Sequence, residues 1–439
     1  MSNITIIDAG CGKGKTEHII RCMNSHQDRP FLYISPLREM FNRLRGEGPY
    51  EGRGAQFDFY TPGNDNFEGL KLRSLKNHMI AGDHVMSTHS LFLALDEEAA
   101  DIINAANYHL IIDEDLNAVS VLSDKYGKAA EEGFSFHELQ RPLNQKDMNL
   151  LKENGFISID ENNYNRVNWI KDTGTGNYRY QDVERMIKTG AVSYVDKTFI
   201  VWSFPIRFLD AFQDITILTY RFGHSILKAY LDFYDKPYEH KTIVQDGNGY
   251  RLTDYDSLVN SGSEYAELIH IFDNPKLNAI GAKIRGIHNN TPLSKNWYQN
   301  HPDQLRTIQN NTYNYFYNYM HATADNVMWT TYKDYKKKVQ PRSYRYAGRD
   351  PDIETFVPCN CRATEAYAGR HVIAYLIDRY LHPGIEKFFQ MRGITVEEDE
   401  FALSELLQWL FRSAVRRGEE IDLYIPSTRM RSLLQRWLA

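Results

Sequence analysis

Cysteine is scarce in this 439-residue chain, which contains only four. Cys359 and Cys361 are separated by one residue, too few for the usual zinc spacing, and Cys11 and Cys22 have no second pair positioned to complete a metal site. The sequence therefore predicts reduced thiols rather than disulfides or structural zinc, as is typical of a cytosolic compartment. On this basis we expect a cytoplasmic protein.

Long apolar runs are also lacking. No run approaches the roughly twenty residues needed to cross a bilayer, so we expect no membrane-spanning segment. Met1 and Ser2 lead straight into an apolar strand, so we expect no signal peptide before it. The partners that we consider below are therefore soluble ones.

Neither sign of charge is in large excess, because 51 Lys and Arg residues stand against 57 Asp and Glu, a net charge of −6. That balance argues against a surface covered by basic patches, but it allows a local basic channel. With 42% hydrophobic and 25% charged residues, the composition is that of an ordinary globular protein. The length is sufficient for two or three domains.

A cluster of glycines and lysines follows the first apolar segment, in the run "ITIIDAGCGKGKTEHII". Residues 9–16 fit the phosphate-binding loop between a strand and a helix, with Ala9 in place of the usual first glycine. Lys15 is expected to reach the β- and γ-phosphates of ATP, and Thr16 to hold Mg²⁺. The alternative is a glycine-rich turn without a ligand. The predicted nucleotide-binding residues are Gly10, Gly12, Lys13, Gly14, Lys15 and Thr16.

An acidic turn ends a second apolar segment, "YHLIIDEDL", about a hundred residues later. Hydrolysis of a γ-phosphate needs one carboxylate for Mg²⁺ and another to orient or deprotonate water. We assign these roles to Asp113 and Glu114, and we expect Asp115 to bond to the segment at Thr88-His89 or at Ser203. The alternative is a solvated acidic turn.

Strands and helices alternate over the first part of the chain, which predicts an α/β fold with a parallel sheet and helices on both faces. Residues 120–198 are more polar and are expected to form an inserted or accessory subdomain. The alternation returns late in the chain, so we predict one α/β domain at 1–220 and another at 221–439. The expected strands lie at 4–8, 31–35, 85–87, 108–113, 199–203, 214–220, 326–333, 355–360 and 419–427, and the expected late helices at 303–320, 363–381 and 402–415.

Gln408, Arg412 and Arg416 are spaced four residues apart, in and directly after the last of these helices, so on a continuous helix they would share one face. Such an array suits an arginine finger that stabilises charge on a γ-phosphate. The alternative is an ordinary polar surface stripe.

Taken together, these motifs resemble those of superfamily 2 (DEAD/DEAH-like) helicases. Residues 9–16 match their A-x-x-G-x-G-K-T loop, and residues 113–115 resemble their D-E-x-D/H box, although Leu116 stands at its fourth place. Gln408 and Arg412 resemble the start of their Q-x-x-G-R-x-x-R motif, with Phe411 replacing the glycine and the second arginine one position late. Residues 203–205 read S-F-P where the family has S-A-T. The C-terminal region resembles divergent helicases carried by bacteriophages.

The resemblance implies two RecA-like lobes, with ATP and Mg²⁺ in a cleft and a single nucleic-acid strand across both lobes. It implies catalytic roles for Lys15, Glu114, Gln408, Arg412 and Arg416. It also implies nucleic-acid contacts from three segments, at Ser35, Pro36 and Arg38, at Thr88 and His89, and at Asn360, Arg362 and Thr364.

A basic and aromatic segment at 332–346 predicts a further strand contact from the residues themselves. Its cations suit phosphates and its tyrosines suit stacked bases. We assign the contact to Lys336, Lys337 and Lys338. The alternative is a solvated basic loop.

These observations favour an ATP-dependent helicase or translocase that acts on DNA, with RNA possible. One alternative is a phosphate-loop ATPase that acts on protein, or on duplex DNA without unwinding. Another is a binding protein that uses ATP as a clamp, which would not need Glu114. If the chain is viral, its expected location is the host cytoplasm.

Overall fold

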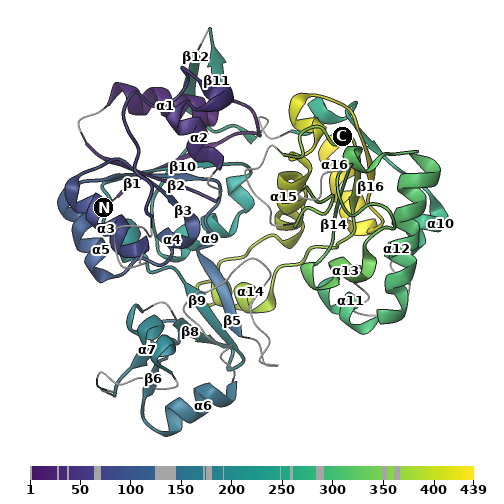
Figure 1. Ribbon diagram of the computed structural model, residues 1–439. Helices are drawn as coiled ribbons and strands as arrows, with labels where there is room; N and C mark the ends of the chain where they lie inside the picture. The colour runs from purple at the N-terminus through teal and green to yellow at the C-terminus, as the bar shows by residue number, and fades with distance from the viewer. Residues whose placement is uncertain are drawn as a thin grey trace. The chain divides into compact units, whose positions relative to one another are not determined.

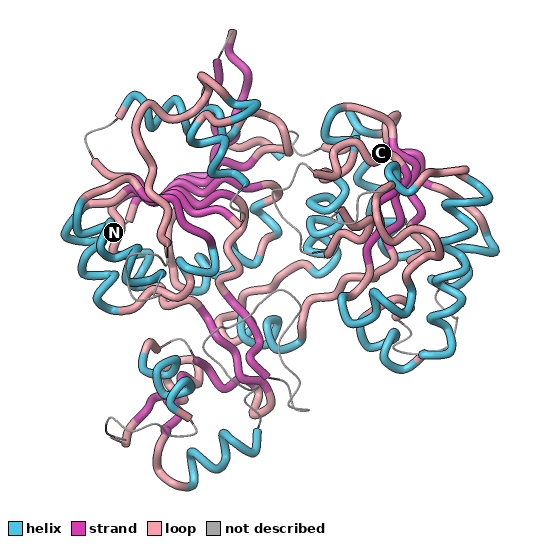
Figure 2. The backbone as a smooth tube through the Cα atoms, viewed as in Figure 1, coloured by secondary structure: helices cyan, strands magenta, loops and turns pink. Residues whose placement is uncertain are grey.

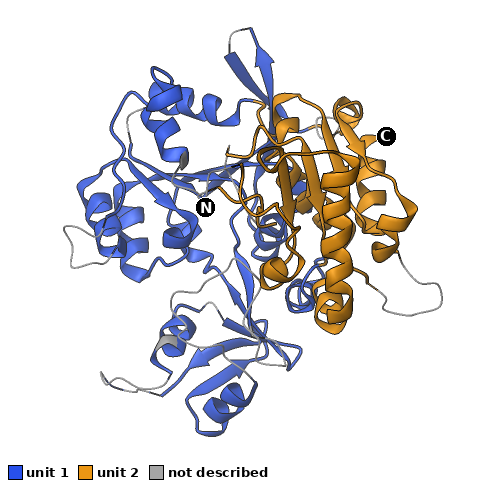
Figure 3. Ribbon diagram, turned by 45° about the vertical axis from the view of Figure 1, so that its right-hand side comes forward, with its two compact units in different colours: residues 1–9, 14–255, 381–396 blue, residues 10–13, 256–380, 397–439 orange. Residues whose placement is uncertain are grey.

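The computed structural model describes residues 2–26, 29–36, 39–63, 71–123, 145–171, 174, 180–190, 192–247, 249–257, 261–282, 291–348, 353–359 and 366–439. Contacts divide the chain into two units, coloured in Figure 3. Unit 1 comprises Met1–Ala9, Gly14–Tyr255 and Leu381–Val396, and unit 2 comprises Gly10–Lys13, Asp256–Tyr380 and Glu397–Ala439. Each unit is α/β.

Unit 1 is built on a seven-stranded sheet in which every neighbouring pair is parallel except β11 and β12 (Figures 1 and 2). Its strands, in spatial order, are β12 (Gly249–Asp254), β11 (Glu239–Asp246), β1 (Asn3–Asp8), β10 (Asp214–Thr219), β4 (His109–Asp113), β2 (Phe31–Ser35) and β3 (Val85–Thr88). In register, Asp8 lies opposite Thr219, and Leu218 lies opposite Asp113. The ends of β1, β10 and β4 therefore meet at one edge.

The central strands are near-continuous apolar runs because they are covered on both faces. On one face, Ile19, Ile20 and Met23 of α1 pack into a cluster with Ile7 and Tyr33. The helices that accompany this sheet are α1 (Lys15–Ser25), α2 (Glu39–Arg45), α3 (Lys71–Ala81), α4 (His89–Phe92), α5 (Glu97–Ala106), α8 (Arg207–Asp210) and α9 (Ile226–Phe233). The predicted fold class is confirmed. Within the described part of the chain, no helix has the length and apolar character that a bilayer crossing requires.

A separate five-stranded antiparallel sheet occupies the region in which a polar subdomain was expected. It contains, in order, β5 (Val119–Ser123), β9 (Phe199–Ser203), β8 (Val192–Val195), β7 (Arg166–Trp169) and β6 (Ile157–Asp160), with helices α6 (Gln145–Glu153) and α7 (Gln181–Lys188). The strand predicted at 199–203 forms, but it pairs with β5 and β8 rather than extending the parallel sheet.

Residues 381–396 pack in unit 1 although the segments before and after them belong to unit 2. Their helix α14 (Pro383–Gln390) stacks Phe388 on Phe233 of α9, with ring centroids 4.4 Å apart. Arg392 Nη2 donates a hydrogen bond to Asp235 at 2.6 Å. A Cβ at Gly384 would lie 2.9 Å from Val121 Cγ2, so the helix approaches β5 closely. The two units therefore do not separate at residue 220 alone. Residues 381–396 belong to unit 1, and so do β11 and β12.

Unit 2 contains a four-stranded sheet that is parallel throughout. Its strands, in order, are β13 (Ile269–Ile271), β16 (Ile421–Tyr424), β15 (Val372–Tyr375) and β14 (Val327–Thr330). Its helices are α10 (Pro275–Asn278), α11 (Lys295–Asn300), α12 (Leu305–Asn314), α13 (Lys336–Val339), α15 (Glu398–Leu410) and α16 (Thr428–Leu438). The predicted return of strand and helix alternation is confirmed.

Two late elements were predicted wrongly. The helix expected at 363–381 is replaced, within its described part, by strand β15. The residues of β15 are fully buried and hydrogen-bonded between β14 and β16, so sheet pairing overrides a pattern that also suits a buried helix. The strand expected at 355–360 is reduced, among its described residues, to one bridge between Phe356 and Trp329.

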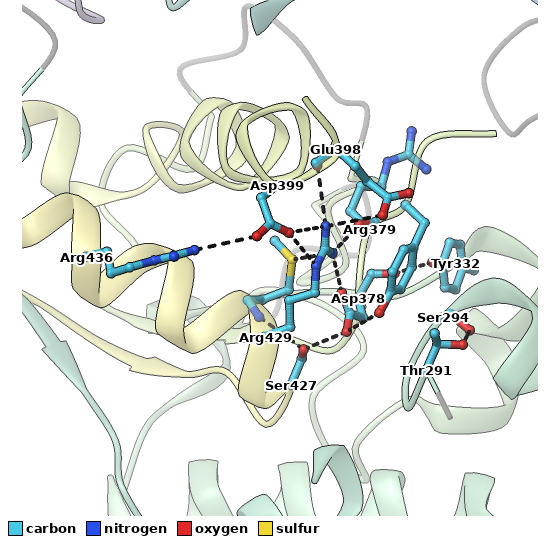
Figure 4. A network of polar contacts seen from close by, with 12 residues as sticks. Thr291, Ser294, Tyr332, Asp378, Arg379, Glu398, Asp399, Ser427, Arg429 and Arg436 are labelled. Carbon is cyan, nitrogen blue, oxygen red and sulfur yellow. Dashed lines mark hydrogen bonds and ion pairs between the residues drawn. The ribbon is translucent and has the colours of Figure 1, made fainter. Parts of the chain in front are cut away.

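A buried ion pair joins the ends of two strands in unit 2 (Figure 4). Arg429, in the first turn of α16, donates from Nη1 to Asp378 Oδ1 at 2.8 Å, and Ser427 Oγ donates to Asp378 Oδ2 at 3.0 Å. The side chain of Asp378 is 2% exposed, and burial raises its pKa despite the charge of Arg429. Tyr332, beyond β14, donates to the Asp378 carbonyl at 2.9 Å. The network therefore fixes one edge of the sheet.

Replacing Arg429 with methionine should lower the free energy of unfolding by about 3–5 kcal/mol, because it leaves a buried carboxylate uncompensated. Urea unfolding measures this loss. The matched control is Arg436→Met, whose side chain is 69% exposed and which should shift stability by no more than about 0.5 kcal/mol. Equal effects of the two substitutions would contradict the importance of the buried pair.

The buried His109 makes the stability of unit 1 depend on pH. Burial, with a smaller effect of the charge on Arg29, lowers the pKa of His109 to about 4. Between about pH 6.5 and pH 4 the unfolded chain therefore binds more protons at this residue than the folded chain, and the free energy of unfolding falls as the pH is lowered, by about 3 kcal/mol. Urea unfolding of wild type and His109→Gln at pH 7 and pH 4.5 should show a smaller loss in the variant. Parallel losses would refute this assignment.

Candidate phosphate-loop site

The loop between β1 and α1 has the backbone geometry that the glycine pattern predicts. Gly12 and Gly14 lie in the left-handed region, with φ of 78° and 89°, which glycine adopts without steric cost. Gly14 directly precedes α1, and no side chain caps the helix. The first-turn N–H groups of a helix have no partners within the helix, so this uncapped start suits an anion.

Tyr250 of β12 closes one side of this loop and was not identified from the sequence. A Cβ at Gly14 would lie 2.2 Å from the Tyr250 ring, so the ring packs directly on the glycine. Arg21 of α1 lies 5.9 Å from the centroid of the same ring. The position of Gly14 is therefore restricted by its neighbour as well as by its φ.

The two loop lysines have different surroundings. Lys15 donates a hydrogen bond from Nζ to the Ala9 carbonyl. Its positive charge opposes the rise in the pKa of Asp113. Lys13 is about half exposed and forms an ion pair at 2.9 Å with Glu264, and both residues belong to unit 2. Thr16 is largely buried at the start of α1. The predicted phosphate contacts of Gly10, Gly12, Lys13, Gly14, Lys15 and Thr16 stay predictions.

Asp113 presents a buried carboxylate at the end of β4. Burial, followed by the charge of Glu114, raises the pKa of Asp113 to about 6, although Tyr33 and Lys15 oppose the shift. Its Oδ2 atom is buried without a hydrogen-bond partner among the described residues. A buried carboxylate oxygen of this kind fits a hard cation such as Mg²⁺, which takes oxygen ligands.

Glu114 has an unusual backbone conformation, with φ of 65°. The left-handed region costs an ordinary residue about 1–2 kcal/mol, and such residues often occur at functional sites. The Glu114 N–H donates to the Leu218 carbonyl at 2.8 Å, which holds the turn against β10. The half-buried side chain is thereby set directly after the buried Asp113.

The ends of β4 and β10 are joined by a side-chain hydrogen bond that the sequence did not indicate. Asp115 Oδ1 accepts a hydrogen bond from Thr219 Oγ1 at 2.5 Å, at the end of β10. β10 pairs directly with β4, which brings Thr219 beside the turn that contains Asp115. The expected contact of Asp115 with residues 88–89 or Ser203 stays a prediction. His89 Nε2 lies 2.9 Å from the Asp113 carbonyl oxygen, while Ser203 bonds to Tyr234.

Asp8 was also missed by sequence reasoning. It is fully buried at the end of β1, and its carboxylate accepts N–H bonds from Arg221 at 2.8 Å and Phe222 at 2.9 Å. His240 Nε2 lies 3.1 Å from the same carboxylate. The sequence did contain one signal for Asp8, which is an acidic residue at the end of an apolar segment and directly before the loop. Asp8 ties β1 to the segment after β10 and to β11.

The predicted arginine face in unit 2 does not form. Helix α15 contains Gln408 but ends at Leu410, and Arg416 lies in the 3-10 helix η10 (Ala414–Arg417). The chain leaves the helix because Ala414 N–H bonds to the Arg370 carbonyl at 3.0 Å. Arg412 is only 2% exposed, whereas Arg416 is partly exposed. The common helical face was therefore wrong, and the catalytic roles of these residues stay predictions.

The predicted strand-binding residues have mixed placements. Ser35 is fully buried at the end of β2, Pro36 is partly exposed, and Thr88 caps α4 by accepting from the Leu91 N–H at 3.3 Å. Three predicted contacts from the late segment and one from the early segment lie outside the described residues, namely Asn360, Arg362, Thr364 and Arg38.

The basic segment offers cations but fewer rings than expected. Lys336 pairs with Glu354, whereas Lys337 and Lys338 are exposed. Tyr332 and Tyr344 are buried, each 4% exposed. Stacking of bases on these two rings was therefore a wrong expectation.

Family comparisons match two parts of the chain. Residues 263–438 match the family described as the YonV C-terminal Rossmann-like domain, and residues 139–202 match the YonV middle domain. Over 449 aligned residues the chain is 29% identical to the "SPbeta prophage-derived uncharacterized protein YonV" of Bacillus subtilis (strain 168), with coverage of 100% of this chain and 99% of that protein.

Solved structures to which the chain is similar carry XPD names. "XPD_APO" aligns with a TM-score of 0.46 and 14% identity, over 99% of this chain and 95% of that chain. "XPD_Helicase" aligns with a TM-score of 0.45 and 12% identity, over 99% and 94%. "Structure of S. tokodaii Xpd4" aligns with a TM-score of 0.44 and 10% identity, over 99% and 94%.

Replacing Thr219 with valine should remove the bond to the buried Asp115 carboxylate without changing side-chain shape. We expect the free energy of unfolding to fall by about 1.5–3 kcal/mol, the range for hydrogen bonds to charged groups. Urea unfolding measures the change, and Thr219→Ser, which keeps a hydroxyl, is the control. A valine variant as stable as wild type would show that the bond contributes little.

Proposed function

We propose that the chain is an ATP-hydrolysing motor that acts on nucleic acid. The observation that carries the proposal is the meeting of the phosphate loop and the acidic turn at one edge of a parallel sheet, separated by the single strand β10. Active sites of open α/β sheets lie at the carboxyl ends of their strands. Asp113 Oδ2, which has no hydrogen-bond partner in the part of the chain that the structure describes, adds support for a bound cation.

In this proposal the loop holds the phosphates. The N–H groups at the start of α1 and the ammonium of Lys15 bind the β- and γ-phosphates. Asp113 and Thr16 would hold Mg²⁺, which would supply positive charge to neutralise the charge that develops on the phosphates. Glu114 orients water and accepts its proton, and its neighbour Asp113 keeps the turn anchored through the carbonyl contact with His89.

Unit 2 would contribute the remaining charge. Arg416, which is partly exposed, is the better candidate for an arginine finger than the buried Arg412, and Gln408 is a further candidate. We propose that the two α/β units act as the two lobes of the motor. Binding and hydrolysis of ATP would change their arrangement and so move a strand.

The track is proposed to be DNA, with RNA as a second possibility. Exposed Lys337 and Lys338 offer charge for a phosphate backbone. The burial of Tyr332 and Tyr344, on the other hand, favours a second candidate, an ATPase that acts on protein or on duplex DNA without unwinding. A phage-encoded role inside a host cytoplasm is proposed by analogy with the prophage-derived relative.

ATP turnover by the full chain, with and without single-stranded DNA, single-stranded RNA or tailed duplexes, tests the proposal. Strong stimulation by one of these supports a nucleic-acid motor and identifies its track. An ATP turnover rate that none of these nucleic acids changes would refute the proposal that the motor acts on nucleic acid. It would favour the second candidate.

Two substitutions should separate binding from chemistry at the loop. Lys15→Ala should abolish turnover and weaken nucleotide binding, because it removes the phosphate contact. Glu114→Gln should reduce turnover by about 100-fold or more, within the range for loss of a general base, and should leave nucleotide affinity nearly unchanged. Turnover and nucleotide titration measure both effects. Unchanged turnover in Lys15→Ala would refute the site.

A further inference from the structure

A cavity of about 540 Å³ lies in unit 2, where α12 and α13 are in contact and the chain continues beyond α13 (helices labelled in Figure 1). Its volume falls within the range of about 300–1,000 Å³ that is typical of small-molecule sites. None of its lining residues belongs to the phosphate loop or the acidic turn. They are Gln309, Lys336, Lys337, Gln340, Pro341, Arg342, Arg345 and Glu354.

The lining of the cavity is strongly cationic. Four basic side chains face a single carboxylate, and Lys336 neutralises that carboxylate through its ion pair with Glu354. Lys337 and Arg342 form no ion pair with any residue that the structure describes, and both are exposed. Arg345 lies over the Tyr346 ring, 4.8 Å from its centroid. Three positive charges therefore remain for an anionic ligand.

The cavity wall is also held in place by contacts that do not use these charges. Gln309 of α12 donates from Nε2 to the Gln340 carbonyl at 2.7 Å, which ties the helix to the segment after α13. Pro341 is buried beside it, and Lys336 lies 4.8 Å from the Phe356 ring centroid. The amide groups of Gln309 and Gln340 add neutral hydrogen-bonding groups to a positive wall.

We propose that this cavity is a second phosphate-binding site, which accepts a ligand of nucleotide size. Arg342 and Arg345 bind the phosphate oxygens, and Lys337 adds a third charge. Arginine forms paired hydrogen bonds with phosphate, which favours phosphate over a smaller or singly charged anion. The ligand is either a free nucleotide or the phosphorylated end of a strand. The site needs no ATP hydrolysis and goes beyond the proposed motor activity.

Titration of the full chain with phosphate-bearing probes tests this site. The Lys15→Ala protein, without Mg²⁺, suppresses binding at the phosphate loop. The probes are pyrophosphate, AMP, and a fluorescent trinucleotide with or without a 5′-phosphate, at one ionic strength. We expect a 5′-phosphate to tighten trinucleotide binding at least tenfold, or pyrophosphate and AMP to bind measurably.

In the variant Arg342→Gln/Arg345→Gln this affinity should fall at least tenfold. The charge-matched control is Lys276→Gln/Lys295→Gln, which removes two exposed cations of the same unit that neither line the cavity nor belong to the basic segment at 332–346. The control should bind within about twofold of its parent. Unfolding curves of both variants verify that unit 2 remains folded.

The outcomes distinguish the two possible ligands of the cavity, a free nucleotide and the phosphorylated end of a strand. Binding of AMP and pyrophosphate identifies a free nucleotide, whereas binding of the 5′-phosphorylated trinucleotide alone identifies a strand end. The proposal is overturned if no probe binds, if the 5′-phosphate makes no difference and the small probes do not bind, or if the control loses as much affinity as the cavity variant. Because no turnover is measured, failure of the motor proposal would leave this result unchanged.

Discussion

The parallel pairing of β1, β10 and β4 is the constraint on which the candidate site depends. Parallel strands end at the same edge, so the loop after β1 and the acidic turn after β4 are brought together although about a hundred residues separate them. The intervening β10 then supplies bonds to both sides. Its Leu218 carbonyl accepts from the Glu114 N–H, and its Thr219 carbonyl accepts from the Ala9 N–H. Backbone hydrogen bonds therefore bring the loop and the acidic turn together, independently of their side chains.

Buried carboxylates recur at the strand ends of both units. In unit 1 Asp8 and Asp115 are held by N–H and hydroxyl donors, and in unit 2 Asp378 is held by a guanidinium. Each is compensated, as a buried charge must be. Asp113 differs because one buried oxygen is left without a hydrogen-bond partner among the described residues. This difference supports the proposal that Asp113, rather than the other three carboxylates, holds a cation.

The sequence was informative where a short segment determines its own geometry. The glycine turn before α1, the apolar strands of the parallel sheet in unit 1 that were expected, and the acidic turn after β4 are local signals, and the structure places each where it was expected. Thr219 and Tyr250 could not be found in this way, because their partners lie about a hundred residues or more away in sequence and depend on strand order. The return of α14 to unit 1 has the same origin, since it depends on the contact of Phe388 with Phe233.

Errors arose where a local pattern was compatible with two structures. The apolar run at β15 suits a buried helix or a buried strand, and pairing with β14 and β16 decides between them. The common face predicted for Gln408, Arg412 and Arg416 required a helix that continues to residue 416. Helix α15 instead ends at Leu410. Helix ends depend on contacts such as the bond from Ala414 to Arg370, which no periodicity reveals.

A crystal structure with Mg²⁺ and a slowly hydrolysed ATP analogue would show whether the loop before α1 and the turn after β4 form one nucleotide site. We expect phosphates on the N–H groups at the start of α1, the Lys15 ammonium turned from the Ala9 carbonyl to the phosphates, and Mg²⁺ beside Thr16 and Asp113. Mg²⁺ would lie about 2.1 Å from each oxygen ligand. A nucleotide bound elsewhere, with Lys15 still on Ala9 and Asp113 remote from the metal, would contradict it.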